Sequence, residues 1–344
     1  MKNSTKSGHI LVYSASFVIV IMGLHLAKAI IVPFLLSIFI TIITAPIMFW
    51  LRKKHVPKFI SYLIVLTIII LIFTILGNII TSSFDALLKD IPVYTEKLKS
   101  TAISMLNWIK SFGYNIPKEQ VLGYINPSYI FNFTAQAIGN IGSILTYTLL
   151  IFIIVTFMLF EYDTFIQKIQ LISGNSKRSV LPFTRITSNI KHYILIKTLT
   201  SITTGVLVSI MLITFKIDYP ILWGLLAFLL NYIPTIGSII AAIPALLLAA
   251  ISGDLSTFTW VSISYIVINN GISNFAEPQI LGDELGISTL VVFLSLVFWG
   301  WTFGPVGMLL SVPITLSIKI ALDAKPETKW IAILLGSAKS LKKK

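Results

Sequence analysis

Polar and helix-breaking residues interrupt the long apolar stretch that covers residues 219–251. The break reads Asn231-Tyr232-Ile233-Pro234-Thr235-Ile236-Gly237-Ser238. Proline removes a backbone donor and glycine loosens a helix, so this break leaves backbone N–H and C=O groups without helical partners. The side chains of Asn231, Thr235 and Ser238 could also exchange hydrogen bonds with a neutral, hydroxylated solute.

A second break of the same kind lies in the apolar stretch that covers residues 287–322. It reads Gly300-Trp301-Thr302-Phe303-Gly304-Pro305-Val306-Gly307, and Pro313 follows it much as Pro244 follows the first break. Lipid cannot satisfy unpaired backbone groups, so both breaks must face protein or a water-filled cavity. Two interrupted apolar segments in corresponding positions are typical of a transporter's substrate site. The alternative is that both breaks are ordinary kinks that help helices to pack.

A third polar group lies between the two breaks and contains Asn270, Asn274, Glu277 and Pro278. An ionised carboxylate inside a membrane is costly and usually functional. Removal from water favours the protonated carboxyl, so Glu277 could take up a proton. Glu277 could instead end a helix at the water boundary and cap its backbone. In the functional interpretation, Asn270, Asn274 and Glu277 line the wall of the site opposite the first break.

Two aromatic residues, Tyr232 and Trp301, could stack on the solute or gate its path, and equally could pack as interfacial aromatics. The predicted pathway residues are Asn231, Tyr232, Pro234, Thr235, Gly237, Ser238, Asn270, Asn274, Glu277, Pro278, Trp301, Gly304, Pro305 and Gly307.

The composition indicates which elements must position these residues. Of the 344 residues, 56% are hydrophobic and 11% are charged, whereas soluble chains have about 45–50% and about 25%. Too few polar residues remain to coat a globular surface, so a soluble enzyme is excluded. The absence of cysteine excludes disulfides, a thiolate nucleophile and cysteine metal sites. We therefore predict an all-α, polytopic membrane protein.

Apolar stretches of suitable length predict the membrane segments, because a bilayer core about 30 Å thick needs about 20 residues per helix. The stretches that fit are residues 10–27, 30–51, 59–80, 141–160 and 198–215, with a shorter run at 258–271. As kinked spans, the two interrupted stretches bring the total to about eight transmembrane segments. As re-entrant hairpins, they leave about six crossings.

The start of the chain imitates a signal peptide, with Lys2 and Lys6 before the first apolar run and Ala27-Lys28-Ala29 after it. The apolar run resumes at once, so a retained first span followed by a tight turn at Lys28 is the simpler prediction.

The chain carries 26 Lys and Arg against 13 Asp and Glu, a net charge of +13. The excess lies between apolar runs without interleaved aromatics, so it indicates topology and no nucleic-acid partner. Positive charge collects in the loop at 52–58, in segment 161–197 and in the tail at 323–344, which should face the cytoplasm. Segment 82–140 is nearly balanced in charge and should lie outside. Both termini are then cytoplasmic.

These assignments predict six regions. They are three transmembrane helices in 1–81, an extracytoplasmic amphipathic helical insertion in 82–140, a transmembrane helix in 141–160, a cytoplasmic amphipathic helical region in 161–197, a transport region with both broken segments in 198–322, and a basic tail in 323–344.

Enzyme motifs are missing from the sequence. It has neither G-x-x-x-x-G-K-[ST] nor H-E-x-x-H, and its four histidines are scattered. No paired carboxylates or nucleophile with its base can be assembled within the apolar segments. We therefore expect no enzymatic activity, no cofactor and no metal site.

Three segments carry the motifs N-Y-I-P-T-I-G-S (231–238), E-P-Q-I-L-G (277–282) and G-P-V-G-M-L-L-S-V-P (304–313). They resemble the signatures of the autoinducer-2 exporter family of bacterial inner-membrane permeases, and the likeness covers nearly the whole chain. Residues 285–301 are similar to one quorum-signal transporter of that family in particular. Many members place a proline shortly after the E-P segment, where this chain has Ser288 and Thr289. That departure weakens the transfer of a substrate from the wider family.

The resemblance implies a carrier or facilitator that moves the small, hydroxylated quorum-sensing signal autoinducer-2 (AI-2) out of the cell across the inner membrane. It also implies a homo-oligomer, with the pentamer as the leading candidate. The family includes members regarded as sodium/proton antiporters and members without an assigned substrate.

Three functional hypotheses remain at this stage. Export or facilitated diffusion of a small polar solute, AI-2 by resemblance, is favoured. Antiport of sodium or another cation against protons would use Glu277 as the exchanging carboxylate. The third is a scaffold that recruits partners through the two amphipathic regions.

Overall fold

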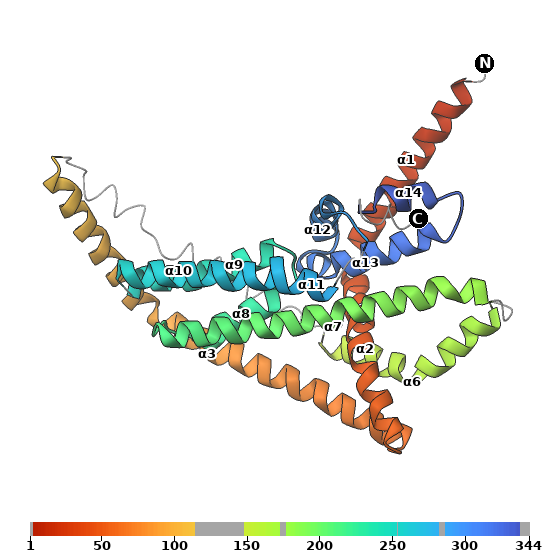
Figure 1. Ribbon diagram of the computed structural model, residues 1–344, viewed down its shortest axis with the longest axis horizontal. Coiled ribbons are helices and arrows are strands. Elements are labelled where there is room, and N and C mark those ends of the chain that lie inside the picture. Colours follow the sequence, from red (N-terminus) through yellow and green to blue (C-terminus); the bar gives the residue numbers. More distant parts are fainter. Residues whose placement is uncertain (1–2, 114–147, 173–176, 253, 282–285, 338–344) are drawn as a thin grey trace. The chain divides into compact units, whose positions relative to one another are not determined.

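The computed structural model describes residues 3–113, 148–172, 177–252, 254–281 and 286–337. Every element within these ranges is a helix, apart from one isolated bridge between Ile287 and Gly336. The prediction of an all-α chain is therefore confirmed. Parts of all six predicted regions lie outside the described residues, and the longest are 114–140 of the insertion, 141–147 of the following span and 338–344 of the tail. The helices, which are labelled in Figure 1, belong to two compact units.

The first unit comprises residues 1–65, 146–194 and 283–344. Its helices are α1 (Asn3–Leu26), α2 (Lys28–Lys53), α6 (Thr148–Ile172), α12 (Thr289–Phe303), α13 (Pro305–Asp323) and α14 (Lys329–Leu334), with the start of α3 (Lys58–Ser111) and the first part of α7 (Lys177–Thr214). Helix α2 packs against α6, α12 and α13. Ser37 of α2 also donates a 3.2 Å hydrogen bond to the carbonyl of Ile151 in α6. Helix α2 is therefore the central helix of this unit.

The second unit comprises residues 66–145 and 195–282. It contains the rest of α3 and α7, with α8 (Pro220–Leu230), α9 (Ile236–Ser252), α10 (Leu255–Asn270), the π-helix η1 (Gly271–Ala276) and α11 (Glu277–Leu281). Its core is formed by large apolar side chains from α7, α8 and α9, among them Val208, Trp223 and Leu248. Van der Waals packing of these side chains holds the helices together and fixes the elements that carry the candidate site.

Helix α3 runs without interruption for 54 residues and contains Pro92. The predicted span at 59–80 and the amphipathic helix expected after it are therefore parts of one helix. Leu87 and Tyr94 are seven residues apart, about two helical turns, so they lie on the same face of α3. Both side chains are buried in the core of the second unit, and this packing outweighs the hydrogen bond lost at Pro92.

Helices α1 and α2 are separated by Ala27 alone. The amide of Ala27 donates to Gly23 and the amide of Ile31 donates to Ala27, so helical hydrogen bonds continue through the junction. The chain bends there without reversing direction, as Figure 1 shows. The tight turn predicted at Lys28 is thus a helix bend, because the junction lacks a proline or glycine to break the helix.

Five described helices are long and apolar enough to cross a membrane. They lie at Lys28–Lys53, Lys58–Ser111, Thr148–Phe165, Ile186–Thr214 and Pro305–Asp323. Several shorter apolar helices accompany them, including α8, α9 and α12. These lengths and compositions agree with a multi-pass membrane protein.

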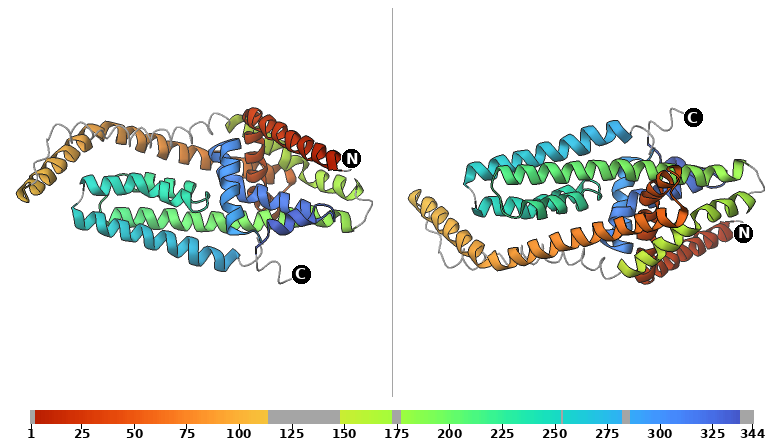
Figure 2. Two further views of the ribbon diagram at one scale, coloured as in Figure 1. Left: turned by 90° about the horizontal axis from the view of Figure 1, so that it is seen from above. Right: turned by 90° about the horizontal axis from the view of Figure 1, so that it is seen from below.

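The two interrupted stretches fold as helical hairpins. Helix α8 has 11 residues, about 16 Å at 1.5 Å per residue, which is too short to cross a bilayer. It packs against α9, and the two lie side by side in both views of Figure 2. In the second hairpin, the Trp299 indole donates to Thr315 at 3.0 Å, and Lys319 donates to the carbonyl of Gly286, farther from the tip. This order of contacts is that of two antiparallel helices.

Candidate functional site

One face of α7 is polar, although the helix is apolar elsewhere. Lys197, Ser201 and Thr204 are spaced by four and three residues, so they form a stripe along the helix. All three are buried, whereas Leu199 and Ile202 on other faces are exposed. In a soluble protein, the polar side chains would be exposed and the apolar ones buried. Buried polar side chains on an outwardly apolar helix are expected where the surroundings are lipid.

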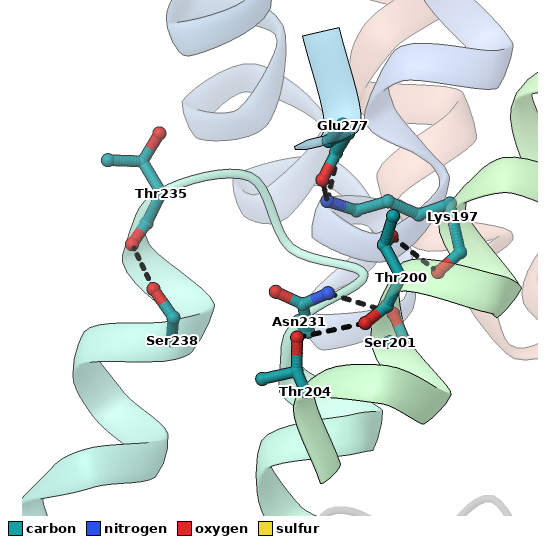
Figure 3. A network of polar contacts seen from close by, with 8 residues as sticks. All are labelled: Lys197, Thr200, Ser201, Thr204, Asn231, Thr235, Ser238 and Glu277. Carbon is teal, nitrogen blue, oxygen red and sulfur yellow. Dashed lines mark hydrogen bonds and ion pairs between the residues drawn. The ribbon is translucent and has the colours of Figure 1, made fainter. Parts of the chain in front are cut away.

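The tip of the first hairpin docks on this stripe (Figure 3). Asn231 is 3% exposed, and its amide nitrogen donates a 3.0 Å hydrogen bond to the hydroxyl of Ser201. The next residue, Tyr232, donates its hydroxyl to that of Thr198 at 2.8 Å. Two consecutive residues of the tip therefore hold it on α7 through side-chain hydrogen bonds.

The tip turns within a few residues, and its backbone is correspondingly constrained. Thr235 has φ +62°, in the left-handed region that residues with a side chain seldom adopt. A Cβ atom placed on Gly237 would lie 1.8 Å from the carbonyl oxygen of Leu230. Only glycine fits there, so the G of the N-Y-I-P-T-I-G-S segment is required by the close return of the chain.

Small residues also allow α8 to approach α7. A Cβ atom on Gly224 would lie 1.8 Å from the Ser209 hydroxyl and 2.6 Å from the carbonyl oxygen of Gly205. A Cβ atom on Gly205 would lie 2.7 Å from the carbonyl oxygen of Gly224. The two helices thus cross at backbone contact, as small residues permit in membrane bundles.

A largely buried ion pair lies one helical turn from Ser201. The ammonium of Lys197 contacts both carboxylate oxygens of Glu277, at 2.9 and 2.8 Å. The two side chains are 4% and 14% exposed. Lys197, Thr198, Ser201, Asn231, Tyr232 and Glu277 together form what we term the polar layer.

The π-helix η1 ends directly before Glu277 and sets its position. The amide of Glu277 donates to the carbonyl of Ile272, five residues back, where an α-helix would use the fourth. One inserted residue turns the side chains that follow by about 100° relative to an uninterrupted α-helix. Single π-turns within α-helices are rare and are frequently found at functional sites.

The second break forms the tip of the α12–α13 hairpin in the first unit. Gly304 has φ +69° and ψ −151°, a combination that is open essentially to glycine alone. A Cβ atom on Gly307 would lie 1.9 Å from the carbonyl oxygen of Trp299, which repeats the arrangement of Gly237 and Leu230. Each hairpin therefore has a glycine just after its tip that lies against the preceding helix.

An aromatic pair covers part of the second tip. Trp301 is exposed on one side and stacks on the imidazole of His25 from α1, with 4.9 Å between ring centroids. The imidazole Nδ1 lies 3.1 Å from the carbonyl oxygen of Thr302, so the tautomer that carries hydrogen on Nδ1 donates to this helix end.

Comparisons with known proteins assign the chain to a family. The family described as AI-2E family transporter matches residues 15–327. The chain belongs to the AI-2E transporter family. It is 37% identical over 348 residues to a protein of Haemophilus influenzae that is provisionally named a transport protein, and the match covers 99% of this chain and 100% of that relative. The family resemblance predicted from the three motifs is thus confirmed.

Two Escherichia coli proteins are also similar to this AI-2E family chain. The AI-2 transport protein TqsA is 34% identical over 327 residues, with 95% of each chain covered. YhhT, provisionally named a transport protein, is 32% identical over 328 residues, with 95% of this chain and 94% of YhhT covered. The family and its relatives are transport proteins and not enzymes, in agreement with the missing enzyme motifs.

Of the predicted pathway residues, Asn231, Tyr232 and Glu277 lie in the polar layer. Thr235 is exposed at the tip, and its carbonyl accepts a 3.2 Å hydrogen bond from Ser238. Pro234 and Gly237 shape the tip. Trp301, Gly304, Pro305 and Gly307 belong to the second hairpin. The roles of all these residues in transport stay predictions.

Asn270 and Asn274 are exposed and bond along their own helix. The amide of Asn274 donates to the Asn270 side chain at 2.6 Å, and that of Asn270 donates to the Ile266 carbonyl at 2.9 Å. Exposed Pro278 follows Glu277 and has no amide hydrogen. Among the described hydrogen bonds, those of Glu277 reach α7, whereas those of Asn270 and Asn274 stay within their own helix.

Lys197 is the last residue of segment 161–197, whose positive charge predicts a cytoplasmic location, so it was not among the predicted site residues. A signal was available, because Lys197, Ser201 and Thr204 have helical spacing at the edge of an apolar stretch.

The polar layer offers ammonium and amide donors, hydroxyl groups that both donate and accept, and a carboxylate. In the described part of the chain, no three His, Asp or Glu side chains come together as a metal site. The arrangement suits a small solute rich in oxygen.

Proposed function

We propose that this AI-2E family transporter carries a small, hydroxylated signal solute, AI-2, across the bacterial inner membrane. The observation that carries the proposal is the polar layer, in which a hairpin tip and an ion pair lie buried on an outwardly apolar helix. The name of TqsA supports AI-2 as the solute. The lysine-rich loops favour both termini in the cytoplasm, and the resemblance favours export and a homo-oligomer.

The hydrogen bonds of the tip suggest how a solute could be bound. Asn231 and Tyr232 bind Ser201 and Thr198 through groups that also form hydrogen bonds with hydroxyls or carbonyls. A solute that enters between tip and helix would replace each internal bond by two of its own, one to each of the separated groups. Binding would then leave no buried polar group of these pairs without a partner.

The second candidate is exchange of a cation against protons at Glu277. Its support is the buried position of this carboxylate. However, the Lys197 ammonium already contacts both carboxylate oxygens, so a cation would have to displace it. The geometry therefore favours a solute that interacts with both Lys197 and Glu277, rather than a bare cation.

The proposal can be tested by efflux of labelled AI-2 from proteoliposomes that contain the purified chain. Asn231→Ala should slow efflux by about tenfold or more, since a buried hydrogen bond is lost where the solute would bind. Asn78→Ala is the matched control, because Asn78 is an exposed asparagine on α3. Efflux at the rate of empty liposomes would overturn the assignment of AI-2. Sodium-driven proton movement in the same vesicles would favour the second candidate.

A further inference from the structure

The ion pair of Lys197 and Glu277 is energetically unusual for its location. Two ions taken from water lose more hydration than their mutual attraction commonly returns, and apolar side chains of similar size often stabilise a core as well. Packing alone therefore does not explain the pair. The π-helix directly before Glu277 is a second, independent sign of function at this position.

The pair adjoins the contacts that hold the hairpin tip. Lys197 precedes Thr198, which accepts the bond from Tyr232, and lies one turn from Ser201, which accepts the bond from Asn231. A solute that replaced these two bonds on α7 would therefore meet the ammonium of Lys197. In the structure, that ammonium is occupied by the carboxylate of Glu277.

The surroundings leave few other groups to exchange a proton. From α7 the neighbours are the hydroxyls of Thr200 and Ser201, and from the tip the neighbour is Asn231 (Figure 3). Thr198 and Tyr232, which bond to each other, adjoin Lys197 and Asn231 in the sequence. Tyr232 is the titratable one, and it donates its proton to Thr198. On the Glu277 side, Asn270 and Asn274 are uncharged. Among the described residues, no further ion pair involves either member of the pair. Protonation of Glu277 is thus the simplest way to release the ammonium.

We infer that the pair is a proton-operated lock on the solute site. In the locked state Glu277 is ionised and holds the Lys197 ammonium. One proton added to a carboxylate oxygen of Glu277 removes the attraction, and the N–H groups of Lys197 then donate to oxygen atoms of the solute. No other covalent bond changes, so each solute bound is linked to one proton. The inference rests on the proposed function, because the solute replaces the carboxylate.

Linkage of one proton to binding has a quantitative signature. Where Glu277 is ionised in the free protein, the Kd for AI-2 should rise about tenfold for each pH unit. Glu277→Gln has the shape of the protonated residue, so its Kd should be independent of pH. Lys197→Met should raise the Kd about tenfold or more at acid pH, where the wild-type lock is open, because it removes the charged donor. Glu96→Gln, in an exposed pair with Lys99, is the control and should keep the wild-type slope.

The charge-exchanged double variant Lys197→Glu/Glu277→Lys separates a lock from a structural brace. It keeps an ion pair but places the ammonium on the other helix. A lock requires the donor on α7, so transport should stay about tenfold or more below wild type even where the variant folds. Wild-type transport with an unchanged pH profile would overturn the inference.

Infrared difference spectra between acid and alkaline buffer report on Glu277 without any transport assay. We expect a protonated-carboxyl band in the acid state that Glu277→Gln removes and Glu96→Gln retains. That result supports the lock even if AI-2 proves to be the wrong solute. Absence of the band would overturn the lock even if AI-2 is transported, so the two proposals fail separately.

Discussion

The phenol of Tyr94, on α3, donates a 2.8 Å hydrogen bond to the carboxylate of Asp218, which lies just before α8. A second bond runs in the opposite direction, since Tyr219 donates to Asp90 of α3. The Trp223 indole also donates to the Asp218 carbonyl at 3.0 Å. Asp90 and Tyr94 are one turn apart, and Asp218 and Tyr219 are adjacent. The base of the first hairpin is thus attached to α3 at two points.

Substitution Tyr94→Phe should lower the free energy of unfolding by about 1–2 kcal/mol, because it removes a hydrogen bond to a charged acceptor and keeps the buried ring. Thermal unfolding of the purified chain in detergent measures the change. Ser104→Ala is the control on the same helix, since its exposed hydroxyl bonds only to the Ser100 carbonyl among the described contacts. Equal losses in both variants would show that the bond to Asp218 contributes nothing.

Alkaline pH should release the second attachment point. Burial, together with the hydrogen bond to Asp90, raises the pKa of Tyr219 to about 12. The unfolded value is about 10, so folding favours the neutral phenol. The stabilisation should therefore be complete below about pH 10 and be lost as the pH rises toward 12. The absorbance of tyrosinate measures this titration. Tyr219→Phe should remove the contribution of one tyrosine that loses its proton near pH 12. A variant that titrates like wild type would contradict the assignment.

The sequence predicted the helices and the two breaks, but not how the breaks fold. A kinked span and a hairpin contain the same apolar residues with the same Pro and Gly signals. The difference depends on tertiary contact, such as the approach of Gly237 to Leu230. Likewise, the sequence predicted a separate amphipathic region from residue 82, whereas burial of Leu87 and Tyr94 keeps α3 continuous.

The candidate site was predictable only in part, for a related reason. Asn231 and Glu277 stand out in sequence as polar residues in apolar surroundings. Lys197 does not, because a lysine at the end of an apolar segment is normally a topology signal. Its partner is 80 residues away, so nothing local marks the pair. The π-turn also rotates Glu277 about the helix axis relative to Asn270. Residue spacing alone therefore could not show that Asn270 and Asn274 do not face α7 together with Glu277.

The glycines at the two tips should be intolerant of any side chain. Gly237→Ala and Gly307→Ala would each place a Cβ atom within 2 Å of a backbone carbonyl oxygen, at 1.8 and 1.9 Å. The backbone must shift, and we expect a loss of about 4 kcal/mol or more, or failure to fold. Gly77→Ala is the control, since its Cβ would meet nothing within 4 Å. Yield and melting temperature after membrane extraction measure the effect, and wild-type values for Gly237→Ala would contradict the hairpin.

The Lys197–Glu277 pair should show strong coupling in a double-mutant cycle. Lys197→Met alone or Glu277→Leu alone leaves an unpaired buried charge, so each should destabilise the chain by about 3–5 kcal/mol. The double variant replaces both charges by apolar side chains and should lie within about 1 kcal/mol of wild type in stability. Unfolding free energies of the four proteins give the coupling energy.

The exposed pair of Lys99 and Glu96 provides the matched cycle, since its atoms are 3.3 Å apart but its side chains are 43% and 77% exposed. Water screens such a pair, so its coupling should stay below about 1 kcal/mol. Similar coupling in both cycles would mean that Lys197 and Glu277 are hydrated in the folded chain. A stable double variant that no longer transports would separate the two roles of the pair, because apolar residues can replace its packing but cannot bind a proton or an oxygen-rich solute.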